Sequence, residues 1–182
     1  MSIPISPTPI HAVLFDLDGT LLDTAPDLTI ALNELLKVKN KAPIAPDIAR
    51  NHVSQGAVAV TRLGFPDVID EIEFEELRQE FLRHYAENIC IETDFFTGMS
   101  DLLNEIEASG TPWGVVTNKP AWLTEPLLEK LSITQRAACI VSGDTTGKRK
   151  PYPEPLLYAS EIINLAPANI VYMGDDPRDI YA

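Results

Sequence analysis

Carboxylates, a lysine and small polar side chains follow four apolar runs of this 182-residue chain. Asp16 and Asp18 open the first polar cluster, and the later clusters lie at 117–119, 148–151 and 174–179. An aspartate such as Asp16 can attack phosphorus and form an aspartyl-phosphate, while Asp18 can protonate the leaving oxygen and then activate water. Because this nucleophile and a phosphate are both anionic, the chemistry requires positive charge in the site. The clusters therefore indicate phosphoryl transfer assisted by a cation.

The other polar residues are of the types that this chemistry needs. The carboxylates of Asp16 and Asp175 are hard oxygen ligands that suit Mg²⁺, which can bridge carboxylate and phosphate oxygens. Lys150 would place a positive charge on the phosphate, and Thr117 and Asn118 would donate hydrogen bonds to it. We therefore expect Mg²⁺ as the cofactor and Lys150 as both a phosphate-binding and a catalytic residue.

The apolar runs that precede the clusters predict buried parallel strands. They span 11–16, 113–117, 138–141 and 170–173, and helical patterns between them span 99–108, 123–131 and 156–165. Strands that alternate with helices predict an α/β fold with a Rossmann-like parallel sheet. Ligands bind beyond the carboxyl ends of the strands in such sheets, so the fold would bring the four clusters together.

The stretch 24–92 interrupts this alternation. It contains no strong strand pattern, and its apolar residues recur at helical spacing over 28–36 and 74–85. We predict an inserted helical module at 24–92, with 1–23 and 93–182 forming the core. Within the module, the segment that holds Gln55 and Gly56 is the candidate for contact with the substrate, and an ordinary turn between helices is the alternative.

Composition limits the partners. The net charge of −13 disfavours nucleic acid and anionic membranes, which attract clustered lysine and arginine. No stretch approaches the ~20 apolar residues of a membrane span, and residues 1–9 lack the basic and long apolar regions of a signal peptide. The two cysteines lack close spacing, as expected of reduced thiols. We expect a cytoplasmic monomer or homodimer that acts on a small phosphorylated metabolite.

The four clusters resemble the four sequence motifs of the haloacid dehalogenase superfamily. Asp-x-Asp-Gly-Thr-Leu-x-Asp at 16–23 resembles the first motif, and Thr-Asn-Lys-Pro at 117–120 resembles the second. Lys-Pro-x-Pro at 150–153 and Gly-Asp-x-x-x-Asp at 174–179 resemble the third and fourth. The motifs occur in order over nearly the whole chain, and the resemblance implies that the module at 24–92 is a helical cap that closes over the site.

The resemblance also implies residue roles. Asp16 would be the nucleophile and a metal ligand, Asp18 the general acid and base with its backbone carbonyl on the metal, and Asp175 the remaining metal ligand. Asp176 and Asp179 would orient a metal-bound water or Lys150. Lys119 is expected to be peripheral to the chemistry.

Within the superfamily, the motifs are most similar to those of the phosphoglycolate phosphatase-like group. Trp-Gly-Val-Val at 113–116 and Gly-Asp-Asp-x-Arg-Asp-Ile at 174–180 resemble its N-acetylmuramic acid 6-phosphate phosphatase branch. The resemblance therefore implies hydrolysis of 2-phosphoglycolate or N-acetylmuramic acid 6-phosphate. A phosphosugar mutase with the same intermediate and a non-catalytic or truncated phosphate-binding protein are the alternatives.

One feature departs from the family pattern. Family chains usually continue past the fourth motif with another strand and helices, whereas this sequence ends three residues after Asp179. We therefore expect either that a C-terminal segment lies outside this sequence or that the protein is truncated. If the segment is missing, one edge of the sheet would be uncovered.

Overall fold

A computed structural model describes residues 9–182. The N-terminal residues that bear on the signal-peptide prediction therefore lie almost entirely outside the described range. Within residues 9–182, four parallel strands form a sheet in the order β5-β4-β1-β6. The strands are β1 (Ala12–Phe15), β4 (Trp113–Val116), β5 (Cys139–Val141) and β6 (Ile170–Met173). They coincide within one or two residues with the four predicted strands, so the predicted α/β fold is confirmed.

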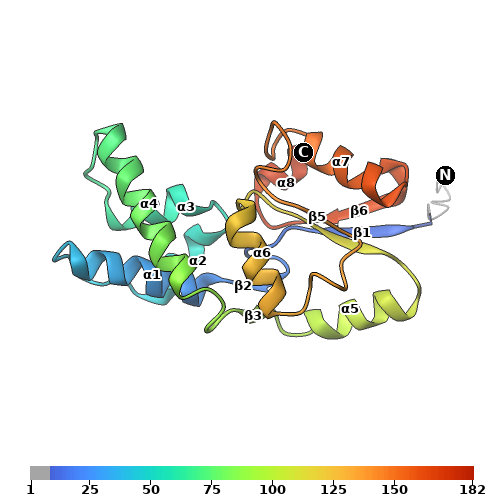
Figure 1. Ribbon diagram of the computed structural model, residues 1–182, viewed down its shortest axis with the longest axis horizontal. Coiled ribbons are helices and arrows are strands. Elements are labelled where there is room, and N and C mark those ends of the chain that lie inside the picture. Colours follow the sequence, from blue (N-terminus) through green and yellow to red (C-terminus); the bar gives the residue numbers. More distant parts are fainter. Residues whose placement is uncertain (1–8) are drawn as a thin grey trace, which may run out of the picture.

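Helices cover both faces of this sheet (Figure 1). Phe15 and Val115 point to a face covered by α5 (Met99–Ala108) and α6 (Ala121–Lys130). The neighbouring residues Leu14 and Val116 point to the opposite face, where they pack against α7 (Glu154–Ile163). Because both faces are buried, the central strands are apolar at consecutive positions rather than at alternate ones.

A two-stranded ribbon that the sequence pattern did not predict connects the sheet to the inserted module. It pairs β2 (Leu22–Asp23) with β3 (Asp94–Phe95) in antiparallel fashion. Two strands of two residues are too short to show a periodic pattern, so sequence alone could not reveal them. The ribbon therefore places the segment that leads into the inserted module beside the segment that leads back to the core.

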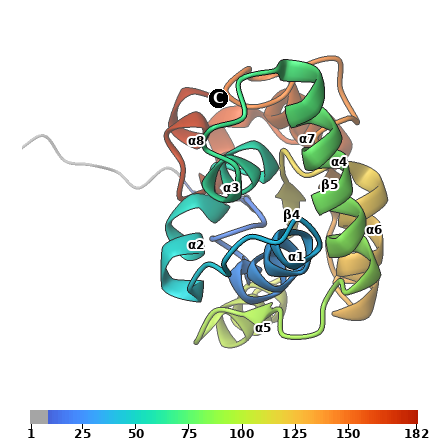
Figure 2. The ribbon, with the colours of Figure 1, turned by 90° about the vertical axis from the view of Figure 1, so that its left-hand side faces the viewer.

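Between β2 and β3 lie four helices, at the left of Figure 1. They are α1 (Ala25–Val38), α2 (Pro46–Val53), α3 (Ala57–Gly64) and α4 (Glu71–Glu87). The buried face of α1 includes Leu28, Leu32 and Leu35, and it packs with Phe81 and Tyr85 of α4. Figure 2 views this module end-on, with α1 in front of the sheet. We call α1–α4 the cap module.

Asp27 links the first turn of α1 to residues 91–93, which directly precede β3. Its side chain is fully buried, and its carboxylate accepts hydrogen bonds from the backbone N–H groups of Ile91, Glu92 and Thr93 and from the Thr93 hydroxyl. A buried carboxylate with four donors is well compensated for its loss of water. The first turn of α1 is thereby fixed next to β3.

Two remaining elements lie near the C-terminal part of the described chain. A 3₁₀ turn, η1 (Pro167–Asn169), precedes β6, and α8 (Pro177–Tyr181) follows it. The strand β6 forms one edge of the four-stranded sheet, and its side chains are half-buried to exposed. No helix in residues 9–182 combines the length and the apolar character needed to cross a membrane.

Candidate active site

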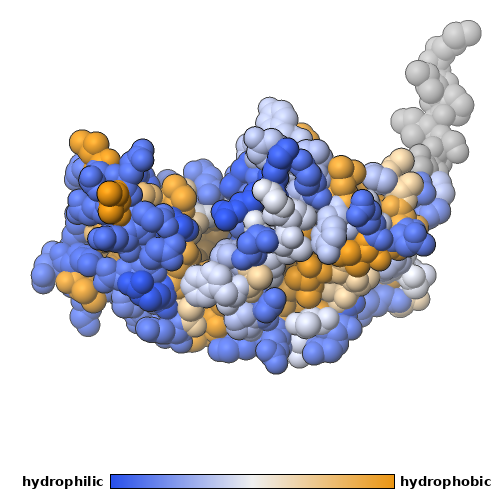
Figure 3. All heavy atoms as spheres, turned by 45° about the horizontal axis from the view of Figure 1, so that its top comes forward, coloured by the Kyte–Doolittle hydropathy of each residue, from blue (hydrophilic) through white to orange (hydrophobic). Residues whose placement is uncertain are grey.

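The loops that follow β1, β4, β5 and β6 meet the turn between α2 and α3 around a cavity of about 440 Å³. Figure 3 shows the molecule hollowed between the cap module and the core. Eight of the predicted site residues line this cavity together: Asp16, Asp18, Thr117, Asn118, Lys150, Asp176, Asp179 and Gln55. Gly56 lines it as well, and Asp175 lies beside Asp16. The structure thus brings the four sequence clusters and the candidate cap turn to one place.

Asp16 stands at the end of β1 with 7% of its surface exposed. Its Oδ1 lies 2.8 Å from Nζ of Lys150 and accepts a hydrogen bond of 2.7 Å from the N–H of Leu17. Burial disfavours the carboxylate and raises the pKa of Asp16 to about 6, although Lys150 opposes the shift. The Asp16 carboxylate is therefore held in a fixed orientation, and Lys150 offsets only part of the cost of burying its charge.

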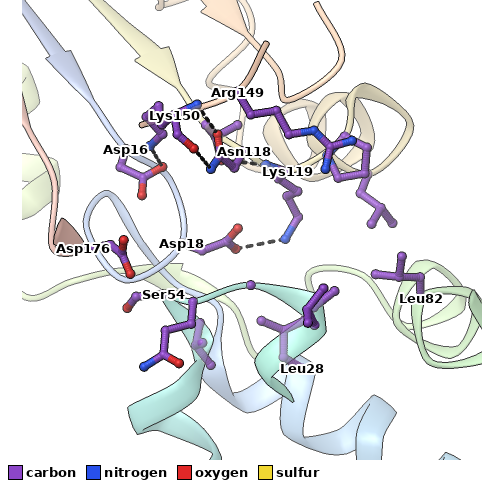
Figure 4. A pocket seen from close by; sticks show the side chains of 18 of the residues that line it. Asp16, Asp18, Leu28, Ser54, Leu82, Asn118, Lys119, Arg149, Lys150 and Asp176 are labelled. Carbon is purple, nitrogen blue, oxygen red and sulfur yellow. Dashed lines mark hydrogen bonds and ion pairs between the residues drawn. The ribbon is translucent and has the colours of Figure 1, made fainter. Parts of the chain in front are cut away.

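Hydrogen bonds and ion pairs fix both the ammonium and the backbone of Lys150. Its Nζ donates to Oδ1 of Asp179 at 2.7 Å and to the hydroxyl of Tyr172 at 2.6 Å. The backbone of Lys150 is clamped by the side-chain amide of Asn118, which accepts from its N–H at 3.0 Å and donates to its carbonyl at 2.9 Å. The ammonium is therefore fixed next to Asp16. Figure 4 shows the hydrogen bonds between Asn118 and Lys150 and the ion pair between Lys150 and Asp16.

Tyr172 is a member of this network that the sequence patterns did not identify. It lies in β6, and its hydroxyl donates to the carbonyl of Val116 at 3.1 Å and also lies 2.9 Å from Oδ1 of Asp179. Burial, together with the nearby carboxylates, raises the pKa of Tyr172 far above its ordinary value. A tyrosine in an apolar run is compatible with simple packing, so its role was visible only in three dimensions.

Thr117 and Asn118 follow β4 as predicted. Oγ1 of Thr117 accepts a hydrogen bond of 3.1 Å from the N–H of Lys119, which leaves the hydroxyl proton available as a donor. The amide nitrogen of Asn118 has two N–H groups and uses one of them on the carbonyl of Lys150. Asn118 therefore positions Lys150, a role that the sequence did not indicate. It also keeps one N–H donor for a phosphate.

Lys119 is not peripheral, contrary to expectation. Its side chain is almost completely buried, and its Nζ lies 2.9 Å from Oδ1 of Asp18 and 4.4 Å from the ring centre of Tyr85. Burial opposes the charge of the ammonium, but Asp18 more than compensates, so the pKa of Lys119 is raised. Sequence reasoning missed this contact because Lys119 and Asp18 are 101 residues apart.

Three carboxylates could hold a metal ion. Asp16, Asp175 and Asp179 each offer an oxygen atom within 4.8 Å of the others. Asp175 also accepts hydrogen bonds from Oγ1 of Thr20 at 3.1 Å and from Oγ of Ser54. Oxygen ligands of this kind suit a hard cation such as Mg²⁺, and the site is consistent with one. Asp179 belongs to this group as well as to the Lys150 network, whereas the Asp18 carboxylate does not.

The carboxylates of Asp176 and Asp179 have different partners. Its carboxylate caps α8 and pairs with Nε of Arg178 at 2.7 Å, and the Nη2 of Arg178 donates to the backbone carbonyl of Ser54 at 2.6 Å. Asp176 therefore orients an arginine that contacts the cap module, while Asp179 contacts Lys150.

The turn that contains Gln55 and Gly56 connects α2 to α3, so it is a turn between helices and also part of the cavity wall. Gly56 has a φ of 83°, a conformation that favours glycine. Gly19 also has a positive φ, and a Cβ there would collide with the carboxylate of Asp175. Close approach of the first motif to Asp175 therefore requires glycine at position 19.

Comparison with known proteins agrees with this geometry. The sequence model that describes the haloacid dehalogenase-like hydrolase family matches residues 13–182 of this chain. The chain belongs to this family. The predicted superfamily is therefore confirmed.

Relatives with curated names narrow the class within the family. The chain is 43% identical over 172 residues to a phosphoglycolate phosphatase from Xylella fastidiosa, covering 94% of this chain and 75% of that protein. It is 40% identical over 171 residues to an N-acetylmuramic acid 6-phosphate phosphatase from Pseudomonas putida, covering 94% and 77%. The predicted enzyme class, a phosphatase of the haloacid dehalogenase family, is confirmed.

Solved structures agree on the fold. The crystal structure of a predicted phosphoglycolate phosphatase from Haemophilus somnus 129pt superimposes with a TM-score of 0.82 at 28% identity, covering 95% of this chain and 80% of that one. The two proteins therefore have the same overall fold.

Proposed function

We propose that this chain is a Mg²⁺-dependent phosphomonoester hydrolase that works through an aspartyl-phosphate intermediate. One observation supports the proposal above the others. The buried Asp16 carboxylate lies 2.8 Å from the ammonium of Lys150, at the carboxyl end of β1 and within one group of three carboxylates. A carboxylate, a fixed cation and a carboxylate cluster together form a site for phosphoryl transfer.

The residues divide the reaction between them. The phosphate would lie against Lys150 and the hydroxyl of Thr117, and an Asp16 oxygen would attack phosphorus. As the phosphorus–oxygen bond to the leaving group breaks, Asp18 would give its proton to the leaving oxygen. Asp18 would next take a proton from water, whose oxygen then attacks the aspartyl-phosphate and releases inorganic phosphate and free Asp16. When bound, Mg²⁺ would neutralise the negative charge shared by Asp16 and the phosphate, held by Asp16, Asp175 and the backbone carbonyl of Asp18.

The cap module would supply the other wall of the site. Its turn at Ser54–Gly56 and its residues Leu28 and Leu82 line the cavity opposite the strand ends. A closed cap would exclude bulk water and strengthen the electrostatic interactions inside. We propose that residues 24–92 act as the cap, residues 1–23 and 93–182 as the catalytic core, and Gln55 as a contact to the leaving group.

The substrate proposed is a small phosphorylated metabolite. The names of the relatives suggest 2-phosphoglycolate and N-acetylmuramic acid 6-phosphate. A cavity of about 440 Å³ falls within the ~300–1,000 Å³ typical of sites for drug-sized ligands, so it has space for a leaving group larger than a two-carbon acid. The cytoplasm is the proposed compartment, because Cys90 and Cys139 are free thiols.

A panel of phosphate esters tests this function. We expect release of inorganic phosphate with Mg²⁺ present, and no release after Asp16→Asn. A mutase would instead move the phosphate to a second hydroxyl of the same molecule without releasing it, so phosphorus NMR of the products distinguishes the two reactions. Failure to turn over any ester, including p-nitrophenyl phosphate, would contradict the proposed function.

A further inference from the structure

We propose that Lys119 determines substrate specificity by binding a carboxylate carried on the leaving group of the phosphate ester. This inference rests on the proposed function and extends it from the phosphate to the other end of the substrate. The substrate class it specifies is a phosphate monoester of a carboxylic acid.

The ammonium of Lys119 is fixed inside the cavity. Backbone contacts hold the residue from both sides, since its N–H donates to Oγ1 of Thr117 and its carbonyl accepts from the N–H of Gly143 at 2.8 Å. Its side chain is 6% exposed. Figure 4 shows it extending across the cavity toward Asp18. A cation placed this way is preorganised, so little side-chain entropy is lost when it binds an anion.

This ammonium has donors to spare. A lysine ammonium has three N–H donors, and one of them accounts for the contact with Asp18 at 2.9 Å. The ring of Tyr85 lies 4.4 Å away and can stabilise the positive charge. The Tyr85 hydroxyl is buried and has no hydrogen-bond partner within residues 9–182. A carboxylate at this point would accept from the free N–H groups of Lys119 and from the Tyr85 hydroxyl.

The other cations that line the cavity are less suited to this role. Lys150 is committed to Asp16, Asp179 and Tyr172. The side chains of Arg78 and Arg178 are 24% and 34% exposed, more than that of Lys119, and Arg149 is exposed and donates to the carbonyl of Gly143. A buried charge interacts with a ligand more strongly than an exposed one, because water screens it less.

The position also fits the leaving group. Lys119 contacts Asp18, the proposed donor to the leaving oxygen, so its ammonium lies beside the first atoms of the leaving group rather than beside the phosphate. A carboxylate one carbon from the ester oxygen, as in 2-phosphoglycolate, would be close to it. A carboxylate farther along a larger leaving group, as on the lactyl ether of N-acetylmuramic acid 6-phosphate, would reach it only by folding back.

Two matched pairs of esters test the proposal. The first pair is 2-phosphoglycolate and its neutral amide, 2-phosphoglycolamide. The second is N-acetylmuramic acid 6-phosphate and N-acetylglucosamine 6-phosphate, which lacks the carboxylate-bearing lactyl group. We expect the wild type to prefer the acid in at least one pair. Lys119→Met should lower kcat/KM for that acid by about 10- to 100-fold more than for its neutral partner, mainly through KM.

The pair that responds identifies the position of the carboxylate. Lys119→Arg should keep part of the preference, because it retains the charge. Lys148→Met removes the same charge from an exposed residue that pairs with Glu154 and does not line the cavity, so it should leave both pairs unchanged. Circular dichroism melts check that each variant is folded.

Two results would overturn the proposal. One is a wild type that turns over the neutral esters as well as the acids in both pairs. The other is a folded Lys119→Met variant that loses acid and neutral ester in equal proportion, since Lys119 would then act only through Asp18. If the wild type hydrolyses no ester at all, the proposed phosphatase function fails instead.

Discussion

The two walls of the cavity are built in opposite ways. On the core side, Lys150 is fixed by Asp16, Asp179, Tyr172 and the Asn118 amide. On the cap side, Leu28, Val53, Ala57 and Leu82 contribute mostly apolar surface, and the turn contributes Gln55, which is exposed. The core wall is a connected polar network, whereas the cap wall combines side chains of several helices with the turn between α2 and α3.

This difference suggests a division of tasks. Phosphoryl transfer requires charges held in fixed positions, because electrostatic stabilisation of a transition state depends on preorganisation. Recognition of a leaving group requires shape and a few contacts that can differ between enzymes sharing the same chemistry. The four predictions that follow test this division, starting with the largest expected effect.

Asp16→Asn should lower kcat by about 10⁴-fold or more, because an amide is not a nucleophile for phosphorus. The protein should remain folded, since Asn keeps the shape of the side chain and Lys150 retains its contact with Asp179. Steady-state kinetics and a thermal melt measure the two effects. Activity within tenfold of the wild type would show that Asp16 is not the nucleophile.

Removal of divalent cations should abolish turnover, and Mg²⁺ should restore it. The carboxylates of Asp16, Asp175 and Asp179 would otherwise repel the substrate phosphate. Zn²⁺ should restore it poorly, because this group contains neither histidine nor cysteine. Assays after exhaustive chelation and metal addition test this, and full activity in chelator would contradict a metal requirement.

Lys150→Met should reduce kcat/KM by about 10²- to 10³-fold for every phosphate ester. The reason is that each substrate presents the same phosphate to the same ammonium. The ratios of kcat/KM between esters should stay within about twofold of the wild-type ratios. A variant that spared some esters would show that Lys150 does more than bind the phosphate that all esters share.

Gln55→Ala should change the ratios of kcat/KM between esters by about 5- to 150-fold, as expected for the loss of a hydrogen bond worth ~1–3 kcal/mol. Its dependence on Mg²⁺ concentration should match that of the wild type, because Gln55 is not one of the three carboxylates that could hold the metal. Equal losses across the ester panel would instead show that Gln55 does not contact the leaving group.

Local sequence patterns were sufficient to predict the sheet and most of the core wall. An apolar run followed by Asp-x-Asp specifies a buried strand that ends in acids, and β1 with Asp16 and Asp18 follows this pattern. The ribbon of β2 and β3 was missed because its strands are two residues long. The helices α2 and α3 were not individually predicted, because each has only eight residues.

The sequence by itself determined which residue types stand at the strand ends, because an apolar run and the polar residues that follow it form a local pattern. Only the tertiary structure decided which of these residues touch. Asn118 clamps Lys150 across 32 positions, and Lys119 meets Asp18 across 101 positions and Tyr85 on the cap module. Such contacts depend on how helices pack on a sheet and on one another. The packing is set by the shapes of many buried side chains at once, so no single motif records it.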